Sequence, residues 1–238
     1  MLELVEIQRV VNQGMTKPLL CKGSDGKSYY AKGKRATASG LIKEWMIAHL
    51  AKAFSLPIPN FHIAYIDSRL IDCFGEETSQ SFGFGQVFVS EQVKSAKDFD
   101  YSLIDKISPE LKKDILIFDL WIENSDRTLT TIAGNPNLLW SELTNKLYII
   151  DHNLAFDDDF KLEDSWDLHP FARNFQLDIH EREALEERLT TSLQNWWQWW
   201  GEIPEKWIEQ HEESGLFNVN QILERLTAEA QGDIWGKL

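Results

Sequence analysis

Residues 123–140, ENSDRTLTTIAGNPNLLW, and residues 145–156, NKLYIIDHNLAF, contain the pattern that decides the fold of this 238-residue chain. In the first stretch, Asp126 follows an apolar helical segment and Asn137 precedes a pair of leucines. In the second, Asp151 follows a short apolar strand. One carboxylate that orients a hydroxyl, followed by an Asn and a second Asp that hold Mg²⁺, is the arrangement used for phosphoryl transfer. We therefore expect Asp126 to act as the base, with Asn137 and Asp151 as the metal ligands.

Two residues beside this set also bear on the site: Asn135 is a second candidate for the metal, and Arg127 has an expected supporting role. Asn135 lies two positions before Asn137 and competes with it for the metal. Asn137 is preferred because it directly precedes the apolar pair. Arg127 follows the expected base directly, and we expect it to stabilise Asp126 or its loop.

The first 90 residues indicate mainly strands with one helix. Short β-rich runs predict strands at residues 5–11, 19–22, 28–32, 61–66 and 86–90. The turn sequence GSDG joins the second and third runs as a hairpin. Apolar residues recur at helical spacing over residues 38–54, which predicts a helix there.

After residue 90 the sequence becomes mostly helical. Ser108 and Pro109 are typical of a helix start, and this helix is expected to run to about residue 123. A second long helix is expected over residues 180–200, and two more begin at Pro204 and Asn218.

Together these patterns predict an α+β protein with two lobes. The β-rich N-terminal lobe is expected over residues 1–90, and the helical C-terminal lobe over residues 91–238. The sequence has no low-complexity tract or internal repeat that would indicate another organisation.

The order N-x-D-R, then N-P-N-L-L, then I-D-H, behind a helix that reads FDLWIEN, resembles the catalytic core of the HipA-like kinases. These enzymes share the fold of protein and phosphoinositide kinases. The resemblance covers roughly residues 5–160. It implies a two-lobed protein-kinase-like fold that uses ATP and Mg²⁺.

The resemblance also implies roles for residues of the N-terminal half. Lys32, at the end of the strand motif YYAK, corresponds to the lysine that contacts the ATP phosphates. Glu44, in the following helix, corresponds to its ion-pair partner, and the turn at residues 12–17 takes the place of the loop that covers the phosphates. The further nucleotide contacts that the resemblance implies are Gly14, Thr16, Lys17, Phe88 and Val89. Thr16 is in addition a candidate site of autophosphorylation.

The sequence departs from the kinase pattern in three places. Ten residues separate Asp126 from Asn137, whereas the protein-kinase loop has four between its Asp and Asn. Thr128 follows Arg127 where lipid-kinase-like relatives often carry His. Asp151 is followed by His-Asn rather than Phe-Gly, so the usual activation-segment switch is not expected.

The amino-acid composition indicates in which compartment the protein is found and which kinds of binding partner are disfavoured. The formal net charge of −14 disfavours a general nucleic-acid or anionic-membrane binder, because neutralising phosphates requires clustered Lys and Arg. No apolar run approaches the roughly 18 residues of a membrane span, and the N-terminus lacks the pattern of a signal peptide. Two cysteines without paired spacing fit reduced thiols. We expect a cytoplasmic protein without a membrane or direct nucleic-acid partner.

The function that the residues and the resemblance imply is transfer of the ATP γ-phosphate to a hydroxyl, with Ser or Thr of a protein as the expected acceptor. Some HipA-like kinases are toxins that phosphorylate translation factors and are neutralised by an antitoxin, so both partners are expectations here. Two alternatives stay open. One is a small-molecule or nucleotidyl transferase on the same fold, and the other is a non-catalytic kinase-like binding module.

Overall fold

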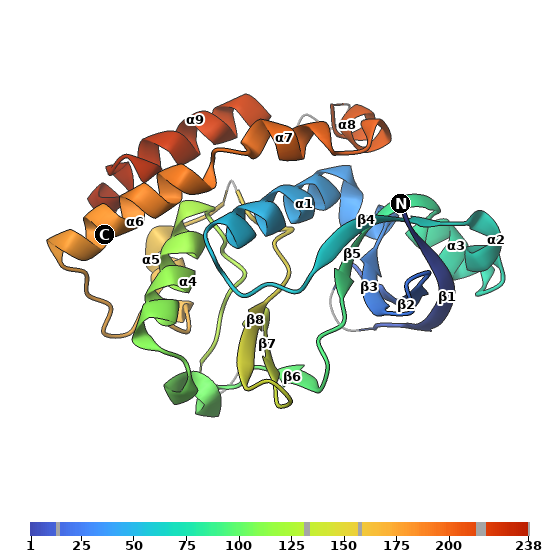
Figure 1. The fold of residues 1–238 in the computed structure, drawn as a ribbon, viewed down its shortest axis with the longest axis horizontal. Coiled ribbons are helices and arrows are strands. Elements are labelled where there is room, and N and C mark those ends of the chain that lie inside the picture. Colours follow the sequence, from blue (N-terminus) through green and yellow to red (C-terminus); the bar gives the residue numbers. More distant parts are fainter. Residues whose placement is uncertain (13–14, 131–133, 157–158, 213–217, 238) are drawn as a thin grey trace. The chain divides into compact units, whose positions relative to one another are not determined.

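The computed structural model describes residues 1–12, 15–130, 134–156, 159–212 and 218–237 (Figure 1). The chain forms two compact units. Unit 1 comprises Met1–Trp45, Pro59–Lys94 and Ile203–Leu216, and unit 2 comprises Met46–Ile58, Ser95–Glu202 and Phe217–Leu238. Strands and helices occur in both units, so the predicted α+β composition is confirmed.

Five strands of unit 1 close into a barrel with the order β1-β2-β3-β5-β4. They are β1 (Leu2–Val10), β2 (Leu19–Gly23), β3 (Ser28–Lys32), β4 (Phe61–Ile66) and β5 (Gly85–Glu91). The β1–β4 pair is parallel and the other neighbours are antiparallel. Side chains alternate along each strand: in β3, Tyr29 and Ala31 are buried in the barrel core, whereas Lys32 faces outward.

Two short helices of unit 1 correct the expectation of one helix in the first 90 residues. They are α2 (Ser68–Asp72) and α3 (Glu76–Phe82). Ile71 and Phe82 pack into the barrel core, so the helices cover the barrel interior. Asp67 begins α2 by accepting a hydrogen bond from the Arg69 amide. The polar sequence of these helices carries no clear apolar repeat, which is why hydrophobic spacing missed them.

The predicted helix at residues 38–54 is confirmed. It follows the short 3₁₀ helix η1 (Lys34–Ala36) as α1 (Thr37–Ala53), and its residues after Trp45 belong to unit 2. Unit 1 also contains α8 (Glu205–Glu212), which begins after Pro204 as expected. Its Trp207 donates from Nε1 to the Gln86 carbonyl at 3.3 Å.

Unit 2 contains a small antiparallel sheet of order β6-β7-β8 and several helices. The sheet strands are β6 (Ala96–Asp98), β7 (Leu138–Ser141) and β8 (Lys146–Ile149). The 3₁₀ helix η2 (Tyr101–Lys106) precedes α4 (Pro109–Trp121), and α5 (Leu162–Leu168) follows the sheet. Ser108 caps α4 by accepting from the Leu111 amide at 3.2 Å, so the predicted helix start is confirmed.

The long helix predicted at residues 180–200 is wrong, because two helices occupy this range. They are α6 (Ile179–Ser192) and α7 (Trp196–Gly201). Tight turns at Leu193 and Gln194 separate them, and Trp196 and Trp199 are both buried after this break. The chain then forms α9 (Val219–Ala230), capped by Asn218 as predicted, and η3 (Asp233–Lys237), which packs on α9.

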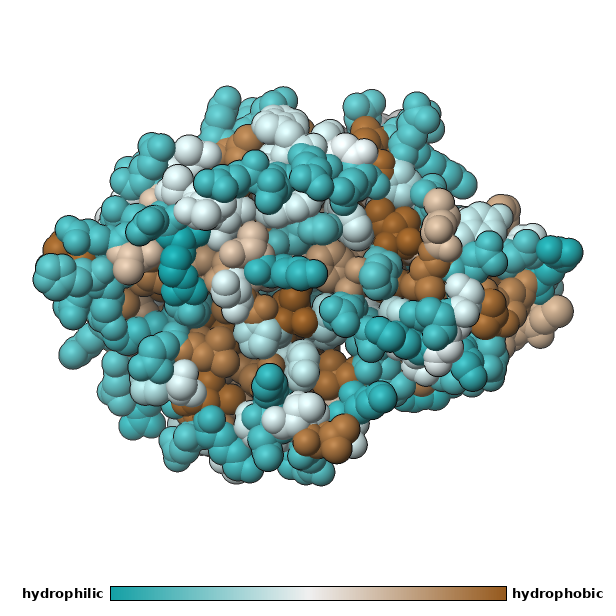
Figure 2. All heavy atoms as spheres, in the orientation of Figure 1, coloured by the Kyte–Doolittle hydropathy of each residue, from teal (hydrophilic) through white to brown (hydrophobic). Residues whose placement is uncertain are grey.

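The visible surface is mostly hydrophilic, with apolar side chains in small separate groups (Figure 2). Among the residues that the structure describes, no helix combines the length and the apolar character that crossing a bilayer requires. Both cysteines are free thiols, with Cys21 buried and Cys73 exposed.

His49 of α1 predicts a pH dependence of stability. It stacks on Trp199 with ring centroids 5.2 Å apart, and burial, with a smaller effect of Lys52, lowers its pKa from 6.5 to about 4. Between these values the unfolded chain binds a proton that the folded protein does not, so acid favours unfolding. We expect this histidine to lower the free energy of unfolding by about 3 kcal/mol between pH 7 and pH 4, measured by urea denaturation. His49→Phe keeps a stacked ring that cannot titrate; an unchanged pH slope in that variant would contradict the assignment.

Candidate active site

Unit 1 contains a largely buried ion pair between β3 and α1. Lys32 Nζ lies 2.5 Å from Glu44 Oε1, and the two side chains are 12% and 3% exposed. Lys32 is the last residue of its strand and points away from the barrel core, whereas Glu44 lies on the helix that follows. A buried cation held by one carboxylate has a fixed position, as a residue that neutralises phosphate charge needs.

The other residues of unit 1 that are expected to contact the nucleotide differ from one another in burial and in where they lie on the barrel. Phe88 pairs with Lys32 across β3 and β5, so both side chains lie on the outer face of the barrel. Val89 is completely buried in the barrel core and is not brought together with Lys32. Thr16 is half-buried and Lys17 is exposed in the turn between β1 and β2. Gly14 lies outside the described residues.

In unit 2, the Asp126 carboxylate is held by two asparagine side chains. Asn137 Nδ2 donates to Asp126 Oδ2 at 2.8 Å, and Asn135 Nδ2 donates to the same oxygen at 3.1 Å. Asn135 and Asn137 thus contact Asp126, although ten residues separate Asp126 from Asn137 in the sequence. Because Asn137 uses its amide nitrogen here, its side-chain oxygen is the atom left for a metal ion.

Arg127, at one end of this loop, forms hydrogen bonds to residues at its other end. Its side chain is fully buried and donates from Nε and Nη2 to the two Asp119 oxygens at 2.5 and 3.2 Å. Its Nη1 donates to the carbonyls of Pro136 and Asn137, both at 2.9 Å. Arg127 therefore acts on the loop rather than facing a substrate, which fits the loop-stabilising role expected from its position.

Asp119 of α4 is the centre of this buried network. Besides Arg127, it accepts from Asn124 Nδ2 at 2.8 Å, and His169 Nε2 lies 3.1 Å from its Oδ2. Burial raises the pKa of Asp119, but the charge of Arg127 and the hydrogen bonds from Arg127 and His169 prevail and hold it well below its ordinary value. Asp119 is therefore ionised, and it neutralises Arg127 inside the protein.

The tautomer of His169 follows from its two contacts. Its Nδ1 accepts from the Phe171 amide at 3.1 Å, so Nε2 carries the proton and donates to Asp119. Burial lowers the pKa of His169, although Asp119 opposes this, so the ring stays neutral at pH 7. A neutral histidine adds a hydrogen bond to Asp119 without a second positive charge beside Arg127.

The β7–β8 hairpin brings the two expected metal ligands to one end of a sheet. Leu138 pairs with Ile149, and the Ile150 amide donates to the Asn137 carbonyl at 3.0 Å, so Asp151 comes directly after a residue paired with Asn137. Asn137 and Asp151 both have left-handed backbones, with φ of 47° and 60°. Such strained conformations in residues other than glycine cluster at functional sites.

The donor set of this hairpin fits a magnesium ion. The Asn137 amide oxygen and the Asp151 carboxylate are the hard oxygen ligands that Mg²⁺ prefers, and Mg²⁺ commonly takes one or two protein ligands together with phosphate oxygens and water. Among the described residues, no group of three or more His, Cys, Asp or Glu side chains could hold a metal on its own. The pair of oxygen ligands therefore fits an ion that is also bound by phosphate oxygens.

Sequence patterns gave no role in this site to Asp119 or His169, whereas Asn124 was noted as the first residue of the N-x-D-R motif. Asp119 gave a usable signal, because it interrupts the apolar run of residues 115–122, where a charge must be paired once the helix is buried. His169 gave none, since 50 positions separate it from Asp119 and only the tertiary fold joins them.

Comparison with known proteins places these features in a family. A profile of the HipA-like kinases matches residues 4–238. The crystal structure of the Helicobacter pylori proinflammatory kinase CtkA is similar at 12% identity and a TM-score of 0.48, over 95% of this chain and 92% of CtkA. HipA of Shewanella oneidensis MR-1, solved with HipB and operator DNA, is similar at 13% identity and a TM-score of 0.43, over 86% of this chain and 57% of that HipA. Curated protein sequences gave no match.

Proposed function

Because this chain belongs to the HipA-like kinase family, we propose that it transfers the γ-phosphate of ATP to a hydroxyl group. The observation that carries the proposal is the Asp126 carboxylate, held by two asparagine amides at the start of the hairpin that leads to Asp151. A carboxylate fixed in this way accepts the proton of an attacking hydroxyl.

The roles of the remaining residues follow from their chemistry. Lys32, held by Glu44, neutralises the charge of the ATP phosphates. Asn137 and Asp151 hold Mg²⁺, which when bound offsets phosphate charge during transfer. Arg127 keeps Asp126 and Asn137 in register through the carbonyl groups that it binds. Further contacts to the nucleotide are proposed for Gly14, Thr16, Lys17 and Phe88, and for the backbone of Val89, whose side chain is buried in the barrel core.

The finer parts of the proposal concern the layout, the acceptor and the partners. Residues 1–90 are proposed as the N-terminal lobe and residues 91–238 as the C-terminal lobe of a protein-kinase-like fold. We propose a Ser or Thr of a protein as the acceptor, Thr16 as an autophosphorylation site and an antitoxin protein as a partner, in a cytoplasmic setting. The exclusion of nucleic acid is not retained, since it depended on net charge alone and the similar Shewanella HipA was solved with DNA.

Labelled ATP separates this proposal from its alternatives. The protein is incubated with Mg²⁺ and either γ-labelled or α-labelled ATP, in the presence of a mixture of cellular proteins as acceptors. Transfer of the γ label into protein supports a protein kinase, and transfer into small molecules supports a small-molecule kinase. Transfer of the α label supports a nucleotidyl transferase. Nucleotide binding without transfer of either label would leave a binding module and refute the proposal.

Lys32→Met tests the nucleotide contact. A ligand that binds only the folded state stabilises it, by about 2.7 kcal/mol at a concentration of 100 times Kd. We expect Mg²⁺·ATP to raise the melting temperature of the wild type and to leave that of Lys32→Met unchanged. Lys27→Met is the matched control, because Lys27 forms an exposed ion pair with Glu91 in the same unit. Equal stabilisation of the wild type and Lys32→Met by ATP would remove Lys32 from the site.

A further inference from the structure

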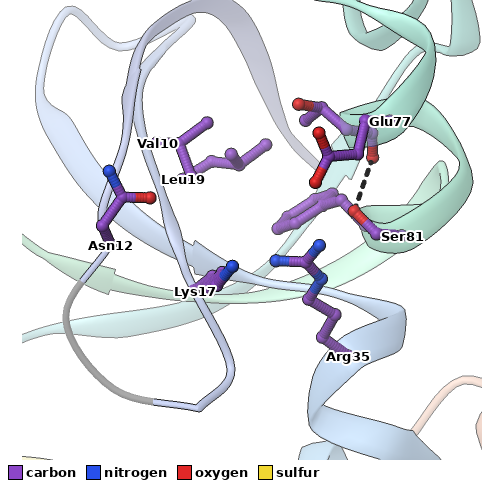
Figure 3. Close-up of a pocket in the computed structure, with 9 residues that line it drawn as sticks. Val10, Asn12, Lys17, Leu19, Arg35, Glu77 and Ser81 are labelled. Atoms are coloured by element: carbon purple, nitrogen blue, oxygen red, sulfur yellow. Dashed lines mark hydrogen bonds between the residues drawn. The ribbon is translucent and has the colours of Figure 1, made fainter.

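A cavity of about 270 Å³ opens at one end of the barrel in unit 1 (Figure 3). Its walls come from Asn12 and Lys17, which lie between β1 and β2, from η1 and from α3. Its apolar floor consists of Val10, Leu19 and Phe82, which pack with the barrel core. The cavity thus lies where α3 covers the interior of the barrel.

Polar side chains surround this floor. Lys17 from the turn and Arg35 from η1 point toward each other across the cavity (Figure 3). Thr78 and Ser81 of α3 add hydroxyl groups, and Glu77 is the carboxylate among the described lining residues. The Ser81 hydroxyl donates to the Thr78 carbonyl at a long 3.4 Å, so a better acceptor can redirect it.

Among the described residues, neither cation forms an ion pair, although Glu77 lines the same cavity. In the described parts of the chain, no ion pair joins Lys17 or Arg35 to a carboxylate, whereas Lys27 and Lys32 each have a glutamate partner. Two facing positive charges repel each other, and an anion between them removes that repulsion. A guanidinium, an ammonium and two hydroxyl groups are the donors that bind phosphate oxygens in proteins.

Gly33, at the start of η1 and two residues before Arg35, lies close to the backbone at the end of α3. A Cβ atom on Gly33 would lie 2.5 Å from the carbonyl oxygen of Phe82, nearer than atoms can approach. Only glycine therefore allows the start of η1 to pack this tightly against the end of α3. The contact packs the start of η1, which carries Arg35, against the end of α3, which carries the hydroxyl groups.

The cavity is distinct from the ion pair proposed to bind ATP. Lys32 and its neighbour Phe88 face the outside of the barrel, whereas the cavity floor continues the barrel interior. Neither Lys32, Glu44 nor Phe88 lines the cavity. Lys17 is the one lining residue that also belongs to the expected nucleotide contacts.

We propose that this cavity binds a phosphate group in addition to the nucleotide of the active site, supplied either by free phosphate or by a small phosphate ester. Arg35 binds the phosphate oxygens and the hydroxyl groups of Thr78 and Ser81 donate to them, while Lys17, which is also proposed to contact the nucleotide, adds positive charge to the cavity wall. Glu77, which repels a bare phosphate, accepts a hydrogen bond from a hydroxyl group of an ester. Nothing in this assignment requires the chain to be a kinase.

Calorimetric titration of the whole chain with inorganic phosphate and with glycerol 3-phosphate, in saturating ADP, tests the proposal. We expect binding that Arg35→Gln weakens about tenfold or more, since a charged hydrogen-bond donor is lost. Glu77→Gln is expected to tighten phosphate binding severalfold, because it removes a repulsive charge. Lys34→Gln is the matched control, as Lys34 is the exposed neighbour of Arg35 on η1 and does not line the cavity.

The two probes distinguish the sources. Tighter binding of glycerol 3-phosphate identifies an ester site, and equal or weaker binding identifies a free-phosphate site. Absence of binding by both probes, wild-type affinity in Arg35→Gln, or displacement of phosphate by ADP would each overturn the proposal. If the cavity does not bind phosphate, label transfer and the ATP-induced stabilisation of Arg35→Gln should still be observed. If the chain is not a kinase, label transfer should be absent while phosphate binding is still observed.

Discussion

Asp126→Asn is expected to lower the rate of phosphoryl transfer about 10²–10⁴-fold while the protein stays folded. The substitution keeps the shape of the side chain and removes the charge that is proposed to accept the hydroxyl proton. One oxygen remains to accept a hydrogen bond from Asn137, so the loop keeps its main contact. The measurement is the rate of γ-label transfer under saturating Mg²⁺·ATP, with the melting temperature recorded for both proteins.

The two asparagines beside Asp126 provide the matched comparison. Asn137→Ala removes the proposed metal ligand and should reduce transfer strongly and raise the Mg²⁺ concentration that half-maximal activity requires. Asn135→Ala removes only the longer of the two hydrogen bonds to Asp126 and should have a small effect. The reverse ranking would assign the metal to Asn135, and full activity of Asp126→Asn would rule out Asp126 as the base.

Asp119→Ala is expected to lower the free energy of unfolding by about 3–5 kcal/mol, because it leaves the Arg127 charge buried without its partner. The Asp119 side chain is 2% exposed and that of Arg127 is 0% exposed, so water cannot replace the lost contact. Urea denaturation at pH 7 measures the effect. Because the pKa of Asp119 is lowered on folding, its contribution is present above the ordinary Asp pKa and is lost in strong acid.

A second aspartate on the same helix is the control. Asp114 binds Arg188 through two hydrogen bonds of 2.8 Å, with side chains that are 21% and 40% exposed. Asp114→Ala should therefore cost about 1 kcal/mol or less, since water solvates the arginine that remains. Equal losses of unfolding free energy in the two variants would mean that the deeper burial of the Asp119 ion pair does not increase its contribution to stability.

Much of the fold could be predicted because each predicted element has a local cause. The hairpin at residues 19–32 has its turn sequence, α4 has its Ser-Pro start, and α1 has its apolar spacing. The break between α6 and α7 has no such local signal. The apolar residues of 180–200 keep helical spacing across the break. The pattern alone therefore does not show that the first helix ends before Trp196 and Trp199, which are both buried.

The contacts within the candidate site could be predicted only in part, and the roles of its residues stay predictions. Asp126, Asn137 and Asp151 are recognisable because their order and the adjoining apolar strand are visible in one stretch of sequence. The side chains that hold this stretch are not, because Asp119 and His169 reach it only through packing of separate elements. The cavity beside Arg35 escaped prediction for a similar reason, since α3 was not expected.

The left-handed backbones of Asn137 and Asp151 have a consequence for how this protein responds to selection. Glycine adopts such conformations without strain, so Asn137→Gly and Asp151→Gly relieve strain in the native state, although glycine also makes the unfolded chain more flexible. Where the relief prevails, a screen for heat tolerance alone would favour glycine at these positions. Its survivors would be stable proteins without the side chains proposed to hold the metal, so thermostabilisation of this protein requires a selection that also demands the proposed activity.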